Sequence, residues 1–235
     1  MRFLIQLTAV LTVAVSLRAE PQGQLIFSDD FERDESVPDK EEPGNGWTTN
    51  SAWRAPGKKQ IDLKDGALHG GTDPSAGHAL VLFHPAGLRD GAVELKFQLP
   101  AGESLGVEFA DPACDTVHAG HLCAVRVSSG QLAITDLKTG NMDLKIQARR
   151  KAGEKSPELD ALLKSKTKTF PVDLKPGEWH TLRFSVNGDT LNATVDGKEV
   201  GAFSSEGMAH PLKHEIRINI GKSASIDEVK IWKFD

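Results

Sequence analysis

The feature that most restricts the fold is a strict alternation of apolar and polar residues in the last third of the chain. Apolar residues occupy every second position in the segments 182–186, 191–195 and 216–220. Two short turns, Asn187-Gly188-Asp189 and Asp196-Gly197, follow the first two of these segments. Runs of period two that are joined by turns of this kind are typical of β-hairpins. We therefore predict an antiparallel β-meander in this region.

The same pattern extends along most of the chain. Further short apolar or alternating segments lie at 25–31, 62–69, 79–83, 93–99, 105–109, 122–127 and 132–134. Between Ile226 and Val229 the apolar positions change from even to odd, which predicts a β-bulge at Asp227-Glu228. About a dozen short strands predict an all-β protein, an antiparallel two-sheet jelly-roll sandwich. An immunoglobulin-like stack is the alternative, but it has fewer strands.

One segment departs from the strand pattern. Ser156-Pro157 is followed by acidic residues and by Leu159, Leu162 and Leu163, which share one helical face. A Ser N-cap with Pro in the first turn is typical of a helix start. We predict one short surface helix, within a loop insertion near residues 140–168. The basic run 149–151 beside it is expected to be a solvated loop or a contact for an acidic partner.

The first residues predict export. Met1-Arg2 precedes an apolar run from Phe3 to Leu17 and then Ala19, as in a secretory signal peptide. We predict cleavage after residue 19, a single domain over residues 20–235 and a secreted or periplasmic location. An uncleaved anchor is the alternative. No other stretch has the length needed to cross a bilayer, so no membrane contact is expected after cleavage.

The charge of the chain limits its partners. The 235 residues include 28 basic and 33 acidic side chains, a formal charge of −5. This balance argues against nucleic acid as a partner. Tyr is absent, so the aromatic platforms available to a sugar are mainly the four Trp residues. Trp47 and Trp53 lie in loop-like sequence and are candidates for exposure, whereas Trp179 and Trp232 lie in strands and are expected to pack.

Two cysteines and two histidines lie within ten residues of one another, at Cys114, His118, His121 and Cys123. Their spacing matches no standard zinc site, and exported proteins oxidise their thiols. A Cys114–Cys123 disulfide is the leading prediction, with two buried free thiols or a metal site as alternatives. His118 and His121 lie on a loop that enters a strand, where a neutral imidazole can act as acid or base. Hydrogen bonding within the loop is the alternative role.

Charged and amide side chains occupy outward positions of several predicted strands. On the concave face of one sheet they would form a polar groove that hydrogen-bonds sugar hydroxyls, because Arg and carboxylate groups suit such recognition. The alternative is a solvated sheet face. The set comprises Glu94, Lys96, Glu108, Arg126, Asp136, Arg183, Asn192, Arg217 and Asn219.

Several motifs resemble those of one family. They are Ser28-Asp29-Asp30-Phe31-Glu32, Asp65-Gly66-Ala67-Leu68 and the segments 93–97, 176–182, 196–200 and 226–232. With these motifs the chain resembles the 3-keto-disaccharide hydrolase family of concanavalin A-like jelly rolls. It is also similar in fold to family 16 glycoside hydrolases and to laminin-G-like domains. The resemblance implies an exported bacterial protein that hydrolyses or binds a glycan.

The resemblance leads to two hypotheses for function. In the first, the chain is a hydrolase-like enzyme with His118, His121 and a carboxylate, Glu94 or Glu108, as catalytic groups. Lys96, Arg126, Asp136, Arg183, Asn192 and Arg217 would then bind substrate. In the second, it is a non-catalytic carbohydrate- or protein-binding module of the laminin-G-like kind. The Glu-x-Asp-x-x-Glu run of family 16 is absent, since the run that begins at Glu158 ends in Leu163.

No cofactor is expected to be required for either function. Jelly rolls of this kind often hold a structural Ca²⁺ between their terminal strands, and the resemblance implies such a site here. Asp29, Asp30 and Asp227 would supply the hard oxygen ligands. Ordinary turn chemistry is the alternative explanation for these residues.

Overall fold

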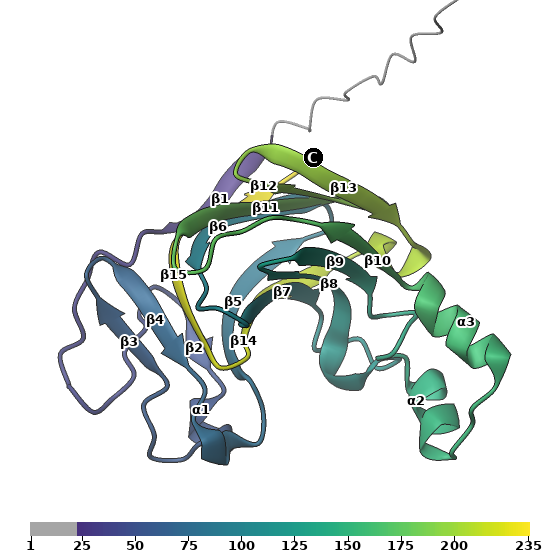
Figure 1. Cartoon of the computed structure of the whole chain (residues 1–235), viewed down its shortest axis with the longest axis horizontal. Coiled ribbons are helices and arrows are strands. Elements are labelled where there is room, and N and C mark those ends of the chain that lie inside the picture. Colours follow the sequence, from purple (N-terminus) through teal and green to yellow (C-terminus); the bar gives the residue numbers. More distant parts are fainter. Residues whose placement is uncertain (1–22) are drawn as a thin grey trace, which may run out of the picture.

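The computed structural model describes residues 23–235, so the predicted signal peptide lies outside the described residues. Two antiparallel sheets pack face to face over this range (Figure 1). The predicted antiparallel sandwich is therefore confirmed. No helix in residues 23–235 is long and apolar enough to cross a membrane.

The first sheet has eight strands. Its order is β13 (Lys198–Ser204), β12 (Thr190–Val195), β11 (Trp179–Asn187), β6 (Gly91–Gln98), β15 (Ser223–Lys233), β4 (Ala67–Gly71) and β3 (Ile61–Lys64), and β1 (Gln24–Asp29) also pairs with β15. The second sheet has seven strands. Its order is β10 (Thr167–Pro171), β9 (Gln131–Asp136), β8 (His121–Ser128), β7 (Ser104–Ala110), β14 (Lys213–Ile220), β5 (Leu80–Leu88) and β2 (Thr48–Thr49).

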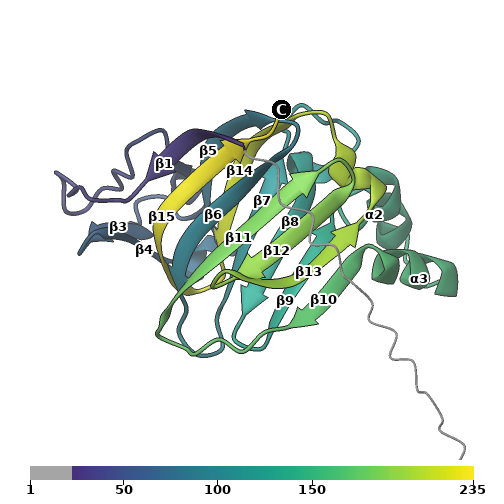
Figure 2. The same ribbon diagram turned by 90° about the horizontal axis from the view of Figure 1, so that it is seen from above.

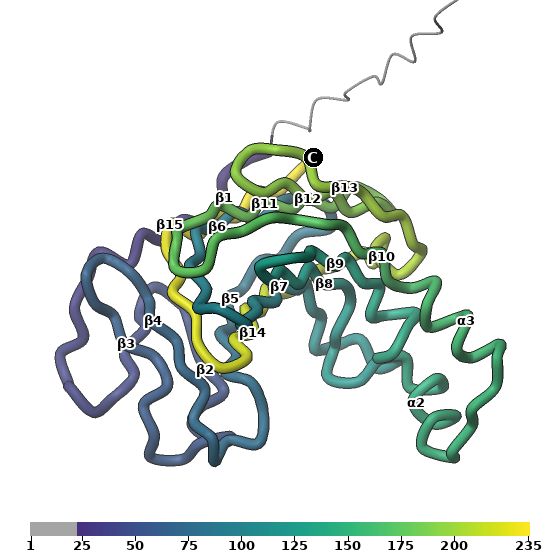
Figure 3. The backbone as a smooth tube through the Cα atoms, in the orientation of Figure 1, coloured from purple at the N-terminus to yellow at the C-terminus, as the bar shows by residue number. Residues whose placement is uncertain are grey.

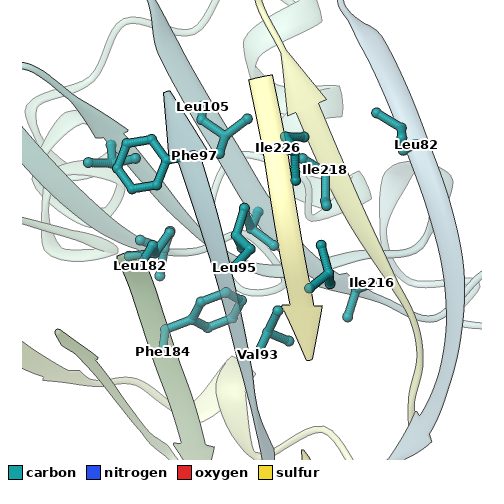
Figure 4. Close-up of a cluster of buried hydrophobic side chains, with 14 of the residues drawn as sticks. Leu82, Val93, Leu95, Phe97, Leu105, Leu182, Phe184, Ile216, Ile218 and Ile226 are labelled. Atoms are coloured by element: carbon teal, nitrogen blue, oxygen red, sulfur yellow. The ribbon is translucent and has the colours of Figure 1, made fainter. Parts of the chain in front are cut away.

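The alternating residues form the core between the sheets. Figure 4 shows Val93, Leu95 and Phe97 of β6 facing Ile216 and Ile218 of β14, and all five are fully buried. Burying each of these side chains contributes roughly 1.5–3 kcal/mol to folding. The alternation that predicts the strands therefore also provides the packing that joins the two layers.

The turns and the bulge follow the sequence as well. Asp196 and Gly197 both have positive φ, as a two-residue hairpin turn requires, and so do Asp65 and Gly66. The pairing of β15 with β6 shifts register between Asp227 and Lys230. The predicted β-bulge is thus confirmed.

The helical part of the prediction was incomplete. Helix α3 (Pro157–Ser165) begins as predicted, because Ser156 Oγ accepts a hydrogen bond from the Leu159 N–H. A second helix, α2 (Leu144–Lys151), covers the basic run that we expected to be a loop. The Asp143 carboxylate caps it by accepting hydrogen bonds from two N–H groups of its first turn. Figure 2 shows both helices beyond the edge of the sandwich that β10 and β13 form.

The whole sandwich is arched. The seven-stranded sheet lies on the inner side of the arch, as the tube in Figure 3 shows. Strands β2, β3 and β4 and the short helix α1 (Ser51–Arg54) lie at one end, and α2 and α3 lie at the other. The outward side chains of the seven-stranded sheet therefore line the concave face of the molecule.

Candidate functional site

The concave face brings together polar residues from three neighbouring strands. On β7, Val107 and Phe109 belong to the core, so Glu108 between them points to the concave face. Arg217 of β14 lies directly opposite Glu108. The pairing of β7 with β8 shifts register near the start of β8, which places His121 alongside Glu108. Three of the predicted site residues thus meet.

These residues form a hydrogen-bonded chain. His121 Nδ1 lies 2.8 Å from Glu108 Oε1, and Arg217 Nη1 lies 3.5 Å from the same oxygen. Arg217 Nε also donates to Glu215 Oε1 at 2.8 Å. Glu108 and Arg217 are only 5% and 7% exposed. In this low-dielectric setting such contacts hold the imidazole and the guanidinium in fixed orientations.

The free nitrogen of His121 remains available to a ligand. Because a carboxylate only accepts hydrogen bonds, Nδ1 donates to Glu108, and in the neutral imidazole Nε2 then holds the free lone pair. Nε2 has no hydrogen-bond partner among residues 23–235. No buried side-chain nitrogen or oxygen in that range lacks a partner, so Nε2 must reach solvent. The same argument applies to Arg217 Nη2.

His118 lies beside this pair. Its ring is stacked on that of His121, with the ring centroids 6.2 Å apart and the planes 24° from parallel. The tight turn that carries it depends on Gly120, which has a φ of 76°. A Cβ atom there would lie 2.4 Å from the Asp111 carbonyl oxygen. The turn therefore fixes His118 at the edge of the site.

His118, His121, Glu108 and Arg217 form a row across the concave face. Two aromatic residues continue this row on the other side of Arg217. Phe83 of β5 lies opposite Arg217 in the sheet, and the guanidinium carbon lies 5.5 Å from the centroid of its ring. Trp53 of α1 lies next, with its ring centroid 6.0 Å from that of Phe83. The alternation in 79–83 predicted the strand but did not single out Phe83, and Glu215 was not predicted as a site residue either.

Arg126 and Asn219 lie on the same face. Arg126 pairs across the sheet with Gly106, and its Nη1 donates to Ser104 Oγ at 3.0 Å. Asn219 lies opposite Gly106 from the other side. The absence of a side chain at Gly106 leaves space between them, since a Cβ there would lie 3.4 Å from that of Asn219.

The remaining members of the predicted polar groove lie elsewhere. Glu94, Lys96, Arg183 and Asn192 belong to β6, β11 and β12 of the eight-stranded sheet, so they point away from the concave face. Glu94 lies 3.7 Å from Arg183, and Lys96 lies 2.5 Å from Glu228. The prediction that these four share one groove with Glu108 was wrong. Glu94, Arg183 and Lys96 form ion pairs on the opposite surface, where Asn192 also lies.

Asp136 is also not positioned to bind substrate. Its carboxylate is fully buried and accepts hydrogen bonds from Thr139 N–H and Oγ1, from Ser205 Oγ and from Gly207 N–H. These donors come from two separate loops. Asp136 therefore joins the loop after β9 to the segment after β13.

The cysteines do not form the predicted disulfide, and both are free. Cys123 points into the core from β8, and burial raises the pKa of its thiol to about 12. Cys114 lies in the loop after β7, where its Sγ contacts Thr116 Oγ1. The alternative of two buried free thiols holds for Cys123 but not for Cys114, which is partly exposed.

The predicted Ca²⁺ ligands lie around a cavity of about 540 Å³ between β1 and the bulge of β15. The Asp29 carboxylate already has hydrogen-bond partners within the protein, because it accepts hydrogen bonds from Arg33 and from Trp47 Nε1. Burial raises the pKa of Asp227. No group of three or more His, Cys, Asp or Glu side chains in the described part of the chain is arranged to hold a metal ion. The Ca²⁺ site stays a prediction.

The tryptophans differ from expectation in two cases. Trp47 is only 4% exposed and packs against Phe27, whereas we considered it a candidate for exposure. Trp179 is 42% exposed, although packing was expected. Trp53 is 61% exposed, as its position in a loop-like sequence allowed. Of the four, only Trp53 has an exposed ring next to the site.

Known structures of β-glucanases share this fold. The non-specific endo-β-1,3(4)-glucanase SCLam of family GH16 matches with a TM-score of 0.55 and 13% identity, over 93% of this chain and 94% of its own. The laminarinase of Rhodothermus marinus matches with a TM-score of 0.58 and 11% identity, over 92% of this chain and 100% of its own. The endo-β-1,3-glucanase of Pyrococcus furiosus matches with a TM-score of 0.57 and 14% identity, over 92% of this chain and 96% of its own. Identities this low show the fold alone, which confirms the predicted concanavalin A-like jelly roll.

Sequence comparisons add one match. No curated protein matches the sequence significantly. Residues 40–223 match the family described as the 3-keto-alpha-glucoside-1,2-lyase-like domain. The matched range contains every residue of the row from Trp53 to Arg217.

Proposed function

This chain belongs to the 3-keto-alpha-glucoside-1,2-lyase-like family, and on that premise we propose that its concave face binds a 3-keto-glucoside and eliminates the substituent at C1. The observation that carries the proposal is the His121–Glu108 pair, 2.8 Å apart, with the second imidazole nitrogen open to solvent. A base in that position is what an elimination of this kind requires.

The reaction follows from the acidity of the sugar. A ketone at C3 makes the hydrogen on C2 acidic, because the resulting anion is an enolate. His121 Nε2 takes this proton, the electron pair forms a C1–C2 double bond, and the C1–O bond breaks. The departing oxygen takes a proton from water, and the hydroxide that remains removes the proton from the imidazolium, which restores the base. Addition of water to the unsaturated product completes a net hydrolysis.

The neighbouring residues have defined tasks in this scheme. Glu108 holds the Nδ1–H tautomer of His121 and stabilises the imidazolium that forms. Arg217 presents Nη2 to solvent beside the base, where a cation stabilises the negative charge that develops on the C3 oxygen. His118 stacks on the imidazole and keeps its plane. Arg126 and Asn219 offer hydrogen bonds to sugar hydroxyls.

A carbohydrate partner has support from one similar structure. A variant of the GH16 glucanase SCLam was solved with 1,3-β-D-cellobiosyl-glucose at its active site. For this chain, the polar row on the concave face makes a sugar the ligand that we propose. Export by the N-terminal residues is part of the same proposal, and sequencing the N-terminus of the mature protein tests it.

The experiment that tests the function measures hydrogen exchange at C2 of the sugar. The full chain is incubated in D₂O with methyl 3-keto-α-glucoside, and deuterium at C2 and released methanol are measured by NMR. We expect both with the wild type, and a loss of about 10²-fold or more with His121→Ala. Glu94→Gln, on the opposite surface, is the matched control and should retain full activity. Equal rates for His121→Ala and wild type would rule out the proposal.

The alternative is a non-catalytic carbohydrate-binding module. The exposed ring of Trp53 favours it, because sugars stack on such rings without any chemistry. Binding of the keto-glucoside without deuterium exchange at C2, in the presence and absence of a chelator, would identify this function instead.

A further inference from the structure

We propose that Trp53 and Phe83 form a platform for a second ring of the substrate, the one attached at C1 of the keto-sugar. The ligand class is a 3-keto-glucoside whose leaving group has a flat C–H or π face, either a sugar or an aryl group. This inference rests on the proposed function and adds the specificity of the same site.

The two rings are arranged as a platform. Their centroids are 6.0 Å apart and their planes are inclined by 36°. Phe83 is half-buried beneath Arg217, whereas Trp53 leaves 61% of its surface exposed. Exposed aromatic surface of this size next to a polar site attracts rings that have one apolar face.

Trp53 is exposed but its backbone is held in place. Asn50, which precedes α1, accepts a hydrogen bond from the Val81 N–H and donates one to the Ala79 carbonyl. Ser51 Oγ accepts a hydrogen bond from the buried side chain of Gln60. The hydrogen bond from Val81 ties the start of α1 to β5, the strand that carries Phe83, and the bond from Gln60 ties α1 to the segment before β3. A platform on a fixed support binds a ring without the entropy cost of ordering a loop.

The spacing of the row selects the size of the ligand. His121 and Phe83 lie on β8 and β5, which are three strand intervals apart because β7 and β14 lie between them. Three intervals correspond to about 14 Å. One sugar ring over His121 and Arg217 therefore does not reach Trp53. A ligand with two rings does, with its second ring beyond Arg217.

The other exposed Trp lacks these features. Trp179 lies at the start of β11 in the eight-stranded sheet, and no aromatic ring of the described residues is paired with it. It therefore serves as a matched control, being a similar side chain on a different surface.

The experiment compares three substrates that differ only at C1, the 3-keto-α-glucosides of methanol, phenol and glucose. We expect Trp53→Ala to lower kcat/KM about tenfold for the two substrates with a second ring and less than threefold for the methyl substrate. Trp53→Phe should recover part of the loss, and Trp179→Ala should change none of the three. A loss for only the phenyl or only the glucosyl substrate identifies which ring the platform accepts.

Two outcomes would overturn the inference. One is an equal loss for all three substrates, which would assign Trp53 to folding. The other is no change for either substrate with a second ring. If the wild type turns over no keto-glucoside, the proposed function fails. The platform is then tested by itself, through quenching of Trp fluorescence by phenyl glucoside and maltose in wild type and Trp53→Ala. Unaltered quenching in the variant would exclude it.

Discussion

His121 of β8 and Glu108 of β7 are joined by a hydrogen bond of 2.8 Å between Nδ1 and Oε1. The bond sets the tautomer of the imidazole, since a carboxylate can only accept. The buried Glu108 carboxylate is also paired, because His121 and Arg217 both contact its Oε1.

The first prediction concerns this bond. Glu108→Gln retains the shape and an accepting oxygen but removes the negative charge that stabilises the imidazolium. We expect the rate of deuterium exchange at C2 to fall about 10²-fold, while KM changes little. The melting temperature provides the control, because a fall in rate that only accompanies unfolding would contradict a role in positioning His121.

The second prediction concerns acid stability and Asp29. Burial disfavours the ionised carboxylate, but hydrogen bonds from Arg33 and from the Phe31 N–H, with the charge of Arg33, outweigh burial and lower the pKa of Asp29 below its ordinary value of 3.8. A lowered pKa stabilises the fold above the pKa of the unfolded chain. This stability is lost as the pH falls through the folded value.

Asp29→Asn should therefore unfold more easily than wild type at pH 7, by about 2 kcal/mol, with the difference shrinking below pH 4. Urea unfolding at several pH values measures it. A constant difference at all pH values would show that the ionisation of Asp29 does not contribute.

The third prediction concerns the thiols. Cys123 is fully buried, with its pKa raised to about 12, whereas Cys114 is partly exposed. At pH 8 a thiol reagent should modify Cys114 rapidly and Cys123 only after unfolding, because the thiolate is the reactive form. Mass spectrometry after brief labelling gives the number of modified thiols. Failure to label either thiol before reduction would indicate the disulfide that the structure lacks.

The fourth prediction concerns Asp136. Asp136→Ala would leave buried donors from Thr139, Ser205 and Gly207 without an acceptor. We expect a loss of about 3 kcal/mol in the free energy of unfolding, measured with urea. The exposed Asp173 is the control, since Asp173→Ala should stay within about 0.5 kcal/mol of wild type. Similar losses in both variants would contradict the assigned role.

Much of the fold could be predicted because the alternation of apolar and polar residues in each strand shows which side chains face the core. The apolar residues of β6 and β14 alternate as the core requires, and the shift at Asp227-Glu228 marks the bulge. The helix α2 was missed although Asp143 is a good N-cap, because its Lys and Arg residues resemble a solvated loop. Alternation and turn chemistry are local, so they are visible in sequence.

The site could be predicted only in part, for a physical reason. The alternation of apolar and polar residues shows that Glu94 and Glu108 both point outward. It does not show that β6 and β7 belong to different sheets. Strand order depends on pairing between distant segments, which no local pattern specifies. Phe83 and Glu215 acquire their importance only when β5 and β7 pair with β14. The predicted Cys114–Cys123 disulfide fails for a local reason, because Cys123 points into the core whereas Cys114 lies in the loop after β7.

The position of β14 has a consequence for synthesis and turnover. This strand lies between β5 and β7, yet it follows both by more than a hundred residues. Until residues 213–220 emerge from the ribosome, β7 lacks a neighbour on that side and Glu108 has no guanidinium beside it. A nascent or clipped chain that ends before β14 therefore lacks the catalytic row, so competence for the proposed reaction arises only when the last strands insert.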